Sequence, residues 1–487
     1  MACKFKVKRL LNKKFNVYPL SVNQTENGTI AMAKRENERI LVVNGFENYG
    51  FNGEDITIKG IKYKLCGLNH ENAVALRKAL PFSAPSRVLR EQRSFGLGDR
   101  LGIATFGHIR LFKQYDAYPI FAQQSIRELN LTERTYEDVL DCVSFNVVQE
   151  GFKRPWGADG DHLKHEDEIQ YALSLGFTML TLDCSEHIRT DVLNLSDEEV
   201  LKEVSLSEEL KEKYLNKDIS FDGKVVSFSE VELARCVLTY NDTIEFASKI
   251  YFEYVNGKNV DFELSIDETS TPTLPVEHYF IAKELCDRGV KLVTVAPRFC
   301  GEFQKGIDYI GNLSQFEEEM KIHVAIANHF GYKLSIHSGS DKFSVFEIIG
   351  KITKGHFHVK TAGTNWLEAM KVVALKDPSL YREVHKYALS MFDEAKKYYH
   401  VTTNINNIPD VDSIPDSELV DLFKNNDCRQ LIHITYGFIL TNKDSKGNYV
   451  FKNRLYDLWD KESEEYANML VKHIGHHLEL LYKGMGK

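Results

Sequence analysis

The stretch KLSIHSGSDKFSVFEIIGKITKGHFHVKTAG, residues 333–363, joins two short strand-like segments through a helix-like one. In KLSIHSG (333–339) apolar and polar residues alternate, and they alternate again in FHVKTAG (357–363), which is the pattern of a β-strand. Both segments end in small and polar residues. A strand, a helix and a second strand in this order form the repeating unit of a parallel sheet.

Similar units recur from about residue 100 to residue 440. Eight segments read as strands: 103–109, 144–150, 178–183, 262–267, 291–297, 333–339, 357–363 and 431–437. Eight repeats without a glycine-rich dinucleotide motif predict an α/β fold of the closed (β/α)8 TIM-like barrel type. A doubly wound open sheet is the alternative.

The segments outside this pattern suggest additions to the barrel. Residues 1–92 combine strand-like runs with one helical stretch and predict an N-terminal α+β cap, followed by the barrel at 93–442. Within the barrel, residues 184–261 are longer than one crossover helix requires and predict a helical insertion. Residues 443–487 predict a C-terminal helical extension.

Composition narrows the possible partners. The 487 residues are 43% hydrophobic and 27% charged, and 61 Lys and Arg against 70 Asp and Glu give a net charge of −9. No basic stripe suggests nucleic acid, no apolar run suggests a membrane span, and no secretion signal is evident, so we expect a cytoplasmic protein. The eight cysteines contain no C-x-x-C pair and are expected to be reduced. A homo-oligomer is compatible with the sequence.

Polar side chains point into the predicted barrel near the ends of its strands. Alternation places His337, His358 and Lys360 inside, although barrel interiors are usually apolar. Buried imidazoles and charges require pairing or a ligand, and we expect His337 and His358, from adjacent strands, to share a divalent metal such as Zn, Mn, Ni or Fe. Pairing with neighbouring carboxylates is the alternative.

Further segments add charge at the same mouth. The block GADGDHLKHEDE (157–168) presents Asp161 and His162, suited to accept a proton and to bind a metal. Other strand ends carry charged groups of both signs, which favours a polar, anionic, polyhydroxylated substrate. These groups are Arg100, Asp267, Glu268, Arg298, Glu302, Lys305, Asp341 and Lys342.

Several separated motifs resemble the tagaturonate epimerase family over nearly the whole chain. They are FGLGDRLGIATFGHI, QEGFKRPWGADGDHLKHEDE, LSIDETSTPT, APRFCGEFQKGIDYIG, IHSGSDKFS and HVKTAGTNW. The resemblance implies a bacterial metal-dependent barrel enzyme of hexuronate catabolism that interconverts D-tagaturonate and D-fructuronate, with some relatives acting on neutral ketohexoses.

The resemblance also implies roles for individual residues. Asp161 would accept a proton, an acid of the Asp267–Glu268 pair would donate one, and His162 and His337 would bind the metal. His358 or Glu302 is left as the third protein ligand, and Arg100, Arg298, Lys342 and Lys360 remain candidates for substrate binding.

The two ketose acids differ at C4, which is β to the ketone, so simple enolisation does not reach it. Retro-aldol cleavage of the C3–C4 bond is therefore favoured over direct deprotonation or transient oxidation. Two alternatives stay open: a metal-dependent isomerase or aldolase of a related ketose or sugar phosphate, and a non-catalytic sugar-binding barrel.

Overall fold

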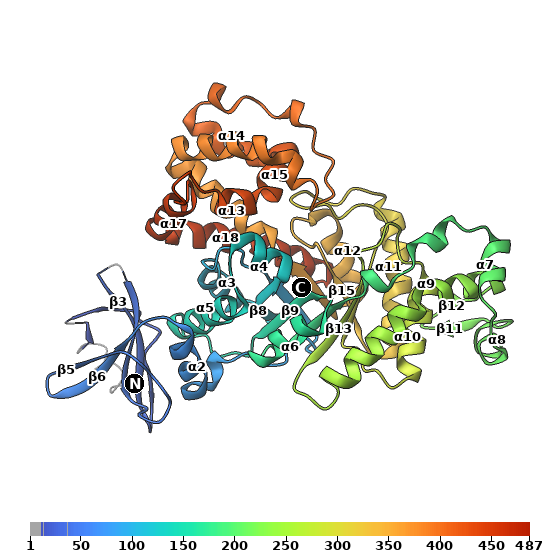
Figure 1. Cartoon of the computed structure of the whole chain (residues 1–487), viewed down its shortest axis with the longest axis horizontal. Coiled ribbons are helices and arrows are strands. Elements are labelled where there is room, and N and C mark those ends of the chain that lie inside the picture. Colours follow the sequence, from blue (N-terminus) through green and yellow to red (C-terminus); the bar gives the residue numbers. More distant parts are fainter. Residues whose placement is uncertain (1–10, 13, 37) are drawn as a thin grey trace.

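The computed structural model describes residues 11–12, 14–36 and 38–487, and its centre is a closed parallel barrel (Figure 1). Around the barrel the strands follow the order β10–β13–β14–β15–β16–β7–β8–β9. Their bounds are β7 (Arg93–Leu97), β8 (Tyr118–Ser125), β9 (Gly157–Leu163), β10 (Met179–Asp183), β13 (Asp261–Ile266), β14 (Thr294–Pro297), β15 (Lys333–Ile336) and β16 (Phe357–Thr361). The predicted barrel is confirmed, and the open sheet is excluded.

Three of the segments predicted as strands are helices instead. Residues 103–109 fall mainly in α3 (Thr105–Phe112), 144–150 end α5 (Tyr136–Gln149), and 431–437 span α15 (Asn426–Ile434) and the start of α16 (Tyr436–Thr441). These helices are buried on most of their surface, and a short apolar run on a buried helix looks the same as a buried strand.

The barrel strands that the sequence analysis missed, β7, β8 and β9, are rich in residues typical of turns. Gly96 of β7 illustrates why they are needed, because a Cβ atom there would lie 1.8 Å from Oε1 of Gln123 on β8. The Gln123 side chain inside the barrel therefore requires a glycine at this position of the neighbouring strand.

Helices cover the outside of the barrel in the usual alternation with the strands. After α4 (Ile126–Thr132) and α5 come α6 (Glu166–Ser174), α10 (Pro275–Asp287), α11 (Leu313–Phe330) and α12 (Phe343–Thr353). Between β10 and β13 lies the predicted helical insertion, which also contains a small hairpin. It consists of α7 (Asp197–Glu203), α8 (Glu208–Tyr214), β11 (Ile219–Phe221), β12 (Lys224–Val226) and α9 (Glu230–Ile250).

The predicted α+β cap precedes the barrel and consists of an antiparallel sheet with one helix, α2 (His70–Ala79). The strands are β1 (Asn16–Val17), β2 (Asn23–Thr25), β3 (Gly28–Arg35), β4 (Glu38–Gly45), β5 (Glu54–Ile58) and β6 (Ile61–Cys66). Leu76 of α2 packs in one apolar cluster with Phe145 and Val148 of α5, which joins the cap to the barrel. Residues 1–10 of the predicted cap lie outside the described residues.

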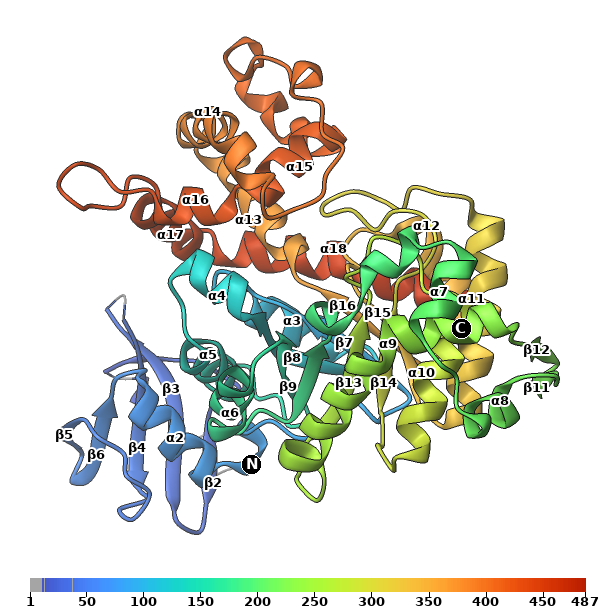
Figure 2. The same cartoon turned by 45° about the vertical axis from the view of Figure 1, so that its right-hand side comes forward.

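The C-terminal helices stand over one end of the barrel (Figure 2). They are α13 (Gly363–Lys376), α14 (Pro378–Ala395), α15, α16, α17 (Lys452–Lys461) and α18 (Ser463–Gly484). The long helix α18 packs against α12 and α3. This arrangement brings α13 and α15 to the mouth of the barrel, where they contribute residues to the site.

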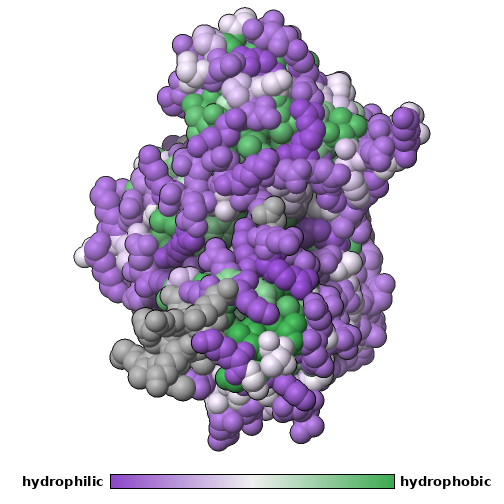
Figure 3. Space-filling model, turned by 90° about the vertical axis from the view of Figure 1, so that its left-hand side faces the viewer, coloured by the Kyte–Doolittle hydropathy of each residue, from purple (hydrophilic) through white to green (hydrophobic). Residues whose placement is uncertain are grey.

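The face of the molecule seen in Figure 3 is mostly hydrophilic, in keeping with the 27% of charged residues. Within the described part of the chain, none of the helices combines the length and the apolar character needed to cross a membrane.

Candidate active site

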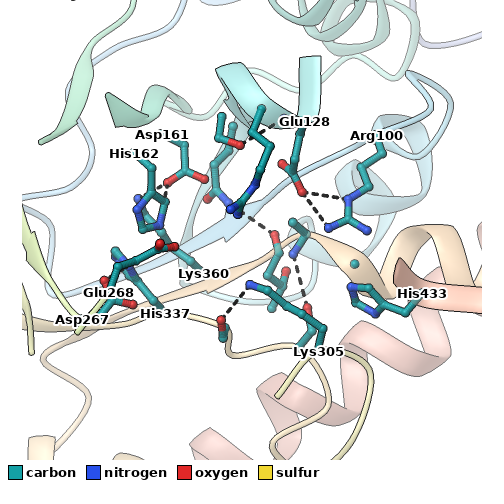
Figure 4. Close-up of a pocket in the computed structure, with 18 residues that line it drawn as sticks. Arg100, Glu128, Asp161, His162, Asp267, Glu268, Lys305, His337, Lys360 and His433 are labelled. Carbon is teal, nitrogen blue, oxygen red and sulfur yellow. Dashed lines mark hydrogen bonds and ion pairs between the residues drawn. The ribbon is translucent and has the colours of Figure 1, made fainter. Parts of the chain in front are cut away.

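A pocket with about 620 Å³ of empty space, part of it open to solvent, lies at the C-terminal ends of the barrel strands (Figure 4). This is where active sites of (β/α)8 barrels are built. The pocket is lined by residues 100, 123, 125, 127, 128, 161, 162, 267, 268, 305, 337, 338, 340, 360–363 and 433.

Beneath the pocket the barrel interior is polar, as the alternation predicted. The Glu263 carboxylate accepts hydrogen bonds from Thr181 Oγ1 (3.1 Å), Thr294 Oγ1 (2.6 Å) and His337 Nε2 (2.8 Å). It also lies 2.9 Å from the Lys360 amine. Glu263 is fully buried and is therefore stabilised only by these partners.

His162, Asp267 and His337 form the cluster at the floor of the pocket that is best suited to a metal ion. Each offers one ligand atom, and the three atoms lie within 4.8 Å of one another. Because His337 Nε2 bonds Glu263, its Nδ1 faces Asp267 Oδ1 at 3.2 Å. His162 has a left-handed backbone (φ +53°) at the end of β9, which turns its ring toward the cluster.

Asp161 lies directly beside this cluster. Its Oδ1 is 2.7 Å from the Lys360 amine and 3.8 Å from His162 Nε2. Burial by itself would raise the pKa of Asp161, but Lys360 and the two imidazoles lower it to about 2. Asp161 is therefore ionised at neutral pH and lines the pocket as a carboxylate.

Lys360 holds three carboxylates together. Its amine lies 2.8 Å from Asp159, 2.7 Å from Asp161 and 2.9 Å from Glu263. These acids outweigh the effect of burial and raise the pKa of Lys360 well above its usual value. The amine is thus a permanent positive charge under the pocket, in contact with the carboxylate predicted to accept a proton.

The remaining predicted metal ligands lie away from the cluster. His358 Nδ1 is 3.0 Å from the Ser94 hydroxyl, and strand register pairs His358 with Ser335 rather than with His337. Burial lowers the pKa of His358 to about 3, so the ring is neutral. Glu302 lines a neighbouring cavity, 3.7 Å from the exposed His400. The structure does not bring either residue to His162 and His337.

Only some of the predicted substrate-binding residues line the pocket. Arg100 and Lys360 line the pocket. Arg298 lines the neighbouring cavity, which shares residues 127, 267, 268, 305, 337 and 338 with the pocket. Lys342 is fully buried, and its amine donates to the backbone carbonyls of residues 304, 307 and 340. Lys342 therefore fixes two loops beside the pocket rather than lining it.

Another group of possible ligands, Asp341, His473 and His477, lies behind the β15 loop. The Asp341 amide donates to His477 Nε2 (2.9 Å), and the Asp341 carboxylate is paired with Arg429 and His473. Because these atoms are already bonded to one another, the group anchors the loop to α18.

Arg127, Glu128 and His433 were not predicted as site residues, yet all three line the pocket. Arg127 and Glu128 follow β8, which was not predicted. The QQS sequence at the end of β8 is a polar strand end that could have indicated them. His433 was expected on a barrel strand, but it reaches the pocket from α15.

Fold and site together define a (β/α)8-barrel enzyme whose pocket combines acids, imidazoles and a buried lysine. The chain belongs to the tagaturonate epimerase family, whose model matches residues 18–481. It is 41% identical over 475 residues, 96% of this chain and 97% of the relative, to the tagaturonate/fructuronate epimerase of Thermotoga maritima. Its fold matches crystal structures of the fructuronate-tagaturonate epimerase of Cohnella laeviribosi, native and with glycerol, with a TM-score of 0.93, 46% identity and 99% of each chain covered. The protein is therefore an epimerase, and a non-catalytic barrel is excluded.

Proposed function

We propose that the protein interconverts D-tagaturonate and D-fructuronate by metal-dependent inversion at C4, as a step of hexuronate catabolism in the cytoplasm. One observation carries this proposal: the pocket holds a possible metal-binding cluster directly beside an ionised carboxylate, Asp161. The names of the relatives support the choice of substrates.

The cluster fits a divalent cation by the chemistry of its donors. The Nδ1 atoms of His162 and His337 are buried and make no well-aligned hydrogen bond among the described residues. They lie beside carboxylate oxygens, His162 Nδ1 3.5 Å from Asp183 and His337 Nδ1 3.2 Å from Asp267, and Asp267 is close enough to both rings to share an ion with them. Imidazole and carboxylate ligands suit Zn, Mn, Ni or Fe, and three protein ligands are typical of catalytic sites. We therefore propose Asp267, instead of His358 or Glu302, as the third ligand. Such a cation supplies positive charge next to oxyanions of the substrate when bound.

Metal content tests this ligand set. The His337→Ala and Asp267→Ala variants should each lose their metal during dialysis, whereas Glu302→Ala and the control His476→Ala, on the exposed side of α18, should keep it. Elemental analysis of folded protein, checked by circular dichroism, measures the difference. Retention of a full equivalent of metal by His337→Ala or Asp267→Ala would remove that residue from the ligand set. Loss of metal by Glu302→Ala would favour Glu302 as a ligand.

The acids next to His162 suggest how C4 is inverted. Asp161 lies 3.8 Å from His162, and a Glu268 oxygen lies within 4.8 Å of it. In our proposal Asp161 accepts the proton of the C4 hydroxyl, and the C3–C4 bond then breaks. C4 becomes an aldehyde carbon, and the electron pair of the broken bond stays on the fragment that contains C2 and C3. After the aldehyde rotates, the bond forms again on its other face, and Glu268 donates a proton to the C4 oxygen.

Isotope retention distinguishes this retro-aldol route from deprotonation at C4. Substrate deuterated at C4 should keep its label through epimerisation in ordinary water, because the C4–H bond never breaks. Proton NMR of the product measures the label. Washout into solvent at the rate of epimerisation would contradict retro-aldol cleavage and favour a C4 carbanion.

A further inference from the structure

The pocket has two chemically different ends (Figure 4). Asp161, His162, Asp267, Glu268 and His337 gather at one end, which we call the reactive end. At the other end lie Arg100, Lys305 and His433, and Arg127 lines the same pocket close enough to Lys305 to act on its charge. We call these four residues the cationic end. The proposed chemistry uses only the reactive end, so the cationic end needs a separate explanation.

The cationic end carries more positive charge than its own carboxylate neutralises. Arg100 is buried and paired with Glu128 (2.7 Å), yet its Nη1 has no hydrogen-bond partner among the described residues. Arg127 lies over the Tyr399 ring at 5.2 Å, and the Lys305 amine donates to the Ser338 hydroxyl (2.8 Å). Burial and the neighbouring Arg127 lower the pKa of Lys305. Three cations thus face two carboxylates, Glu128 and the more distant Glu268, which leaves an excess of positive charge.

His433 occupies a slot shaped for its ring. The side chain is fully buried, and neither ring nitrogen has a hydrogen-bond partner among the described residues. A Cβ atom at Gly363 would lie 1.8 Å from Cε1 of His433, and one at Gly306 would lie 3.0 Å from its Nδ1. Burial, Arg100 and Lys305 keep the pKa of His433 well below its usual value, so the ring is neutral and offers one N–H donor.

The start of α13 adds to the positive potential. The 14-residue helix begins at Gly363, which lines the pocket, and its N-cap residue, Ala362, has no side chain that can cap the first turn. The positive end of the helix dipole therefore faces the cationic end. Unpartnered Arg100 Nη1, unpartnered His433 and an uncapped helix start converge on one place, which is the pattern of an anion site.

We propose that the cationic end binds the C6 carboxylate of the substrate, so that the pocket selects uronates over neutral ketohexoses. This inference rests on the proposed function, which places C2 to C4 at the reactive end. The carboxylate of a six-carbon ketose acid is at the opposite end of the chain from the ketone, and Arg100, Lys305 and His433 supply donors there. Lys342 does not line the pocket, and Arg298 lines the neighbouring cavity, which shares Arg127 and Lys305 with it.

Two measurements test the proposal. The first is the KM and kcat for D-tagaturonate and for D-tagatose, which lacks the carboxylate. Lys305→Met and Arg127→Met should raise KM for the uronate about 10–100-fold with little change in kcat, and should leave the KM for tagatose unchanged, because a charge-assisted hydrogen bond to an unreactive group is lost. Lys202→Met, on the exposed α7, is the matched control.

Gly363→Ala is a further variant for the same kinetic measurement, and it removes no charge. The added methyl group displaces the His433 ring, so this variant should lose affinity for the uronate in the same way as His433→Ala, while His433→Gln, which keeps an N–H donor, should recover part of it. Equal losses on tagatose and tagaturonate would overturn the proposal.

The second measurement is binding by calorimetry of D-gluconate and of D-sorbitol, its neutral counterpart, which requires no turnover. The wild-type protein should prefer gluconate, and Lys305→Met should abolish the preference. This result would support the cationic end even if tagaturonate were not epimerised. No preference in the wild type, or a preference that survives in Lys305→Met and Arg127→Met, would overturn the proposal.

Discussion

Replacing Lys360 by methionine is expected to reduce the free energy of unfolding by about 3–5 kcal/mol, the loss typical of breaking a buried ion pair. Lys360 is 4% exposed, and its amine is the shared partner of Asp159, Asp161 and Glu263. Without it, three carboxylates that are fully or nearly fully buried would lose the one cation that all of them share. Methionine keeps a similar length, so the change removes charge with little loss of packing.

Urea denaturation monitored by circular dichroism measures this loss, provided that the transition is reversible. Lys351→Met is the matched control, because Lys351 pairs with Glu317 at the surface and its side chain is 65% exposed. That variant should stay within about 0.5 kcal/mol of the wild type. A loss below about 1 kcal/mol in Lys360→Met would show that the three carboxylates do not depend on the lysine.

The Asp161→Asn variant is expected to lower kcat by about 10²–10⁴-fold, the range for loss of a general acid or base. Asparagine has almost the same shape and can still accept a hydrogen bond from Lys360, so the fold should survive. Its side chain cannot accept the C4 hydroxyl proton. Since His162, Asp267 and His337 are unchanged, the metal content should equal that of the wild type.

Asp167→Asn, an exposed position in the first turn of α6, is the control and should leave kcat unchanged. Steady-state rates and elemental analysis on the same preparations separate loss of the base from loss of the metal. Turnover of Asp161→Asn at the wild-type rate would mean that Asp161 takes no proton in the rate-limiting sequence of steps.

The sequence by itself determined the barrel architecture and which of the main site residues point into the barrel. Strand-and-helix alternation predicted the barrel, and five of the eight strand positions were correct, among them those that carry His337 and Lys360. Alternation also turned His337, His358 and Lys360 inward, because side chains on a strand point to opposite faces in turn. These properties are local, so they can be read from the order of residues alone.

Only the tertiary structure decided how deep each inward side chain lies in the barrel, how neighbouring strands pair, and which residues form the cationic end of the pocket. His358 and Lys360 both point inward, but two residues on a strand span about 6.6 Å, which leaves His358 below the cluster. The register that pairs His358 with Ser335 sets this depth, and it depends on contacts between strands. His433 comes from a buried helix whose apolar run reads like a strand. The position of His433 beside Arg100 and Lys305 depends on how the C-terminal helices pack over the barrel mouth, which no local sequence pattern specifies.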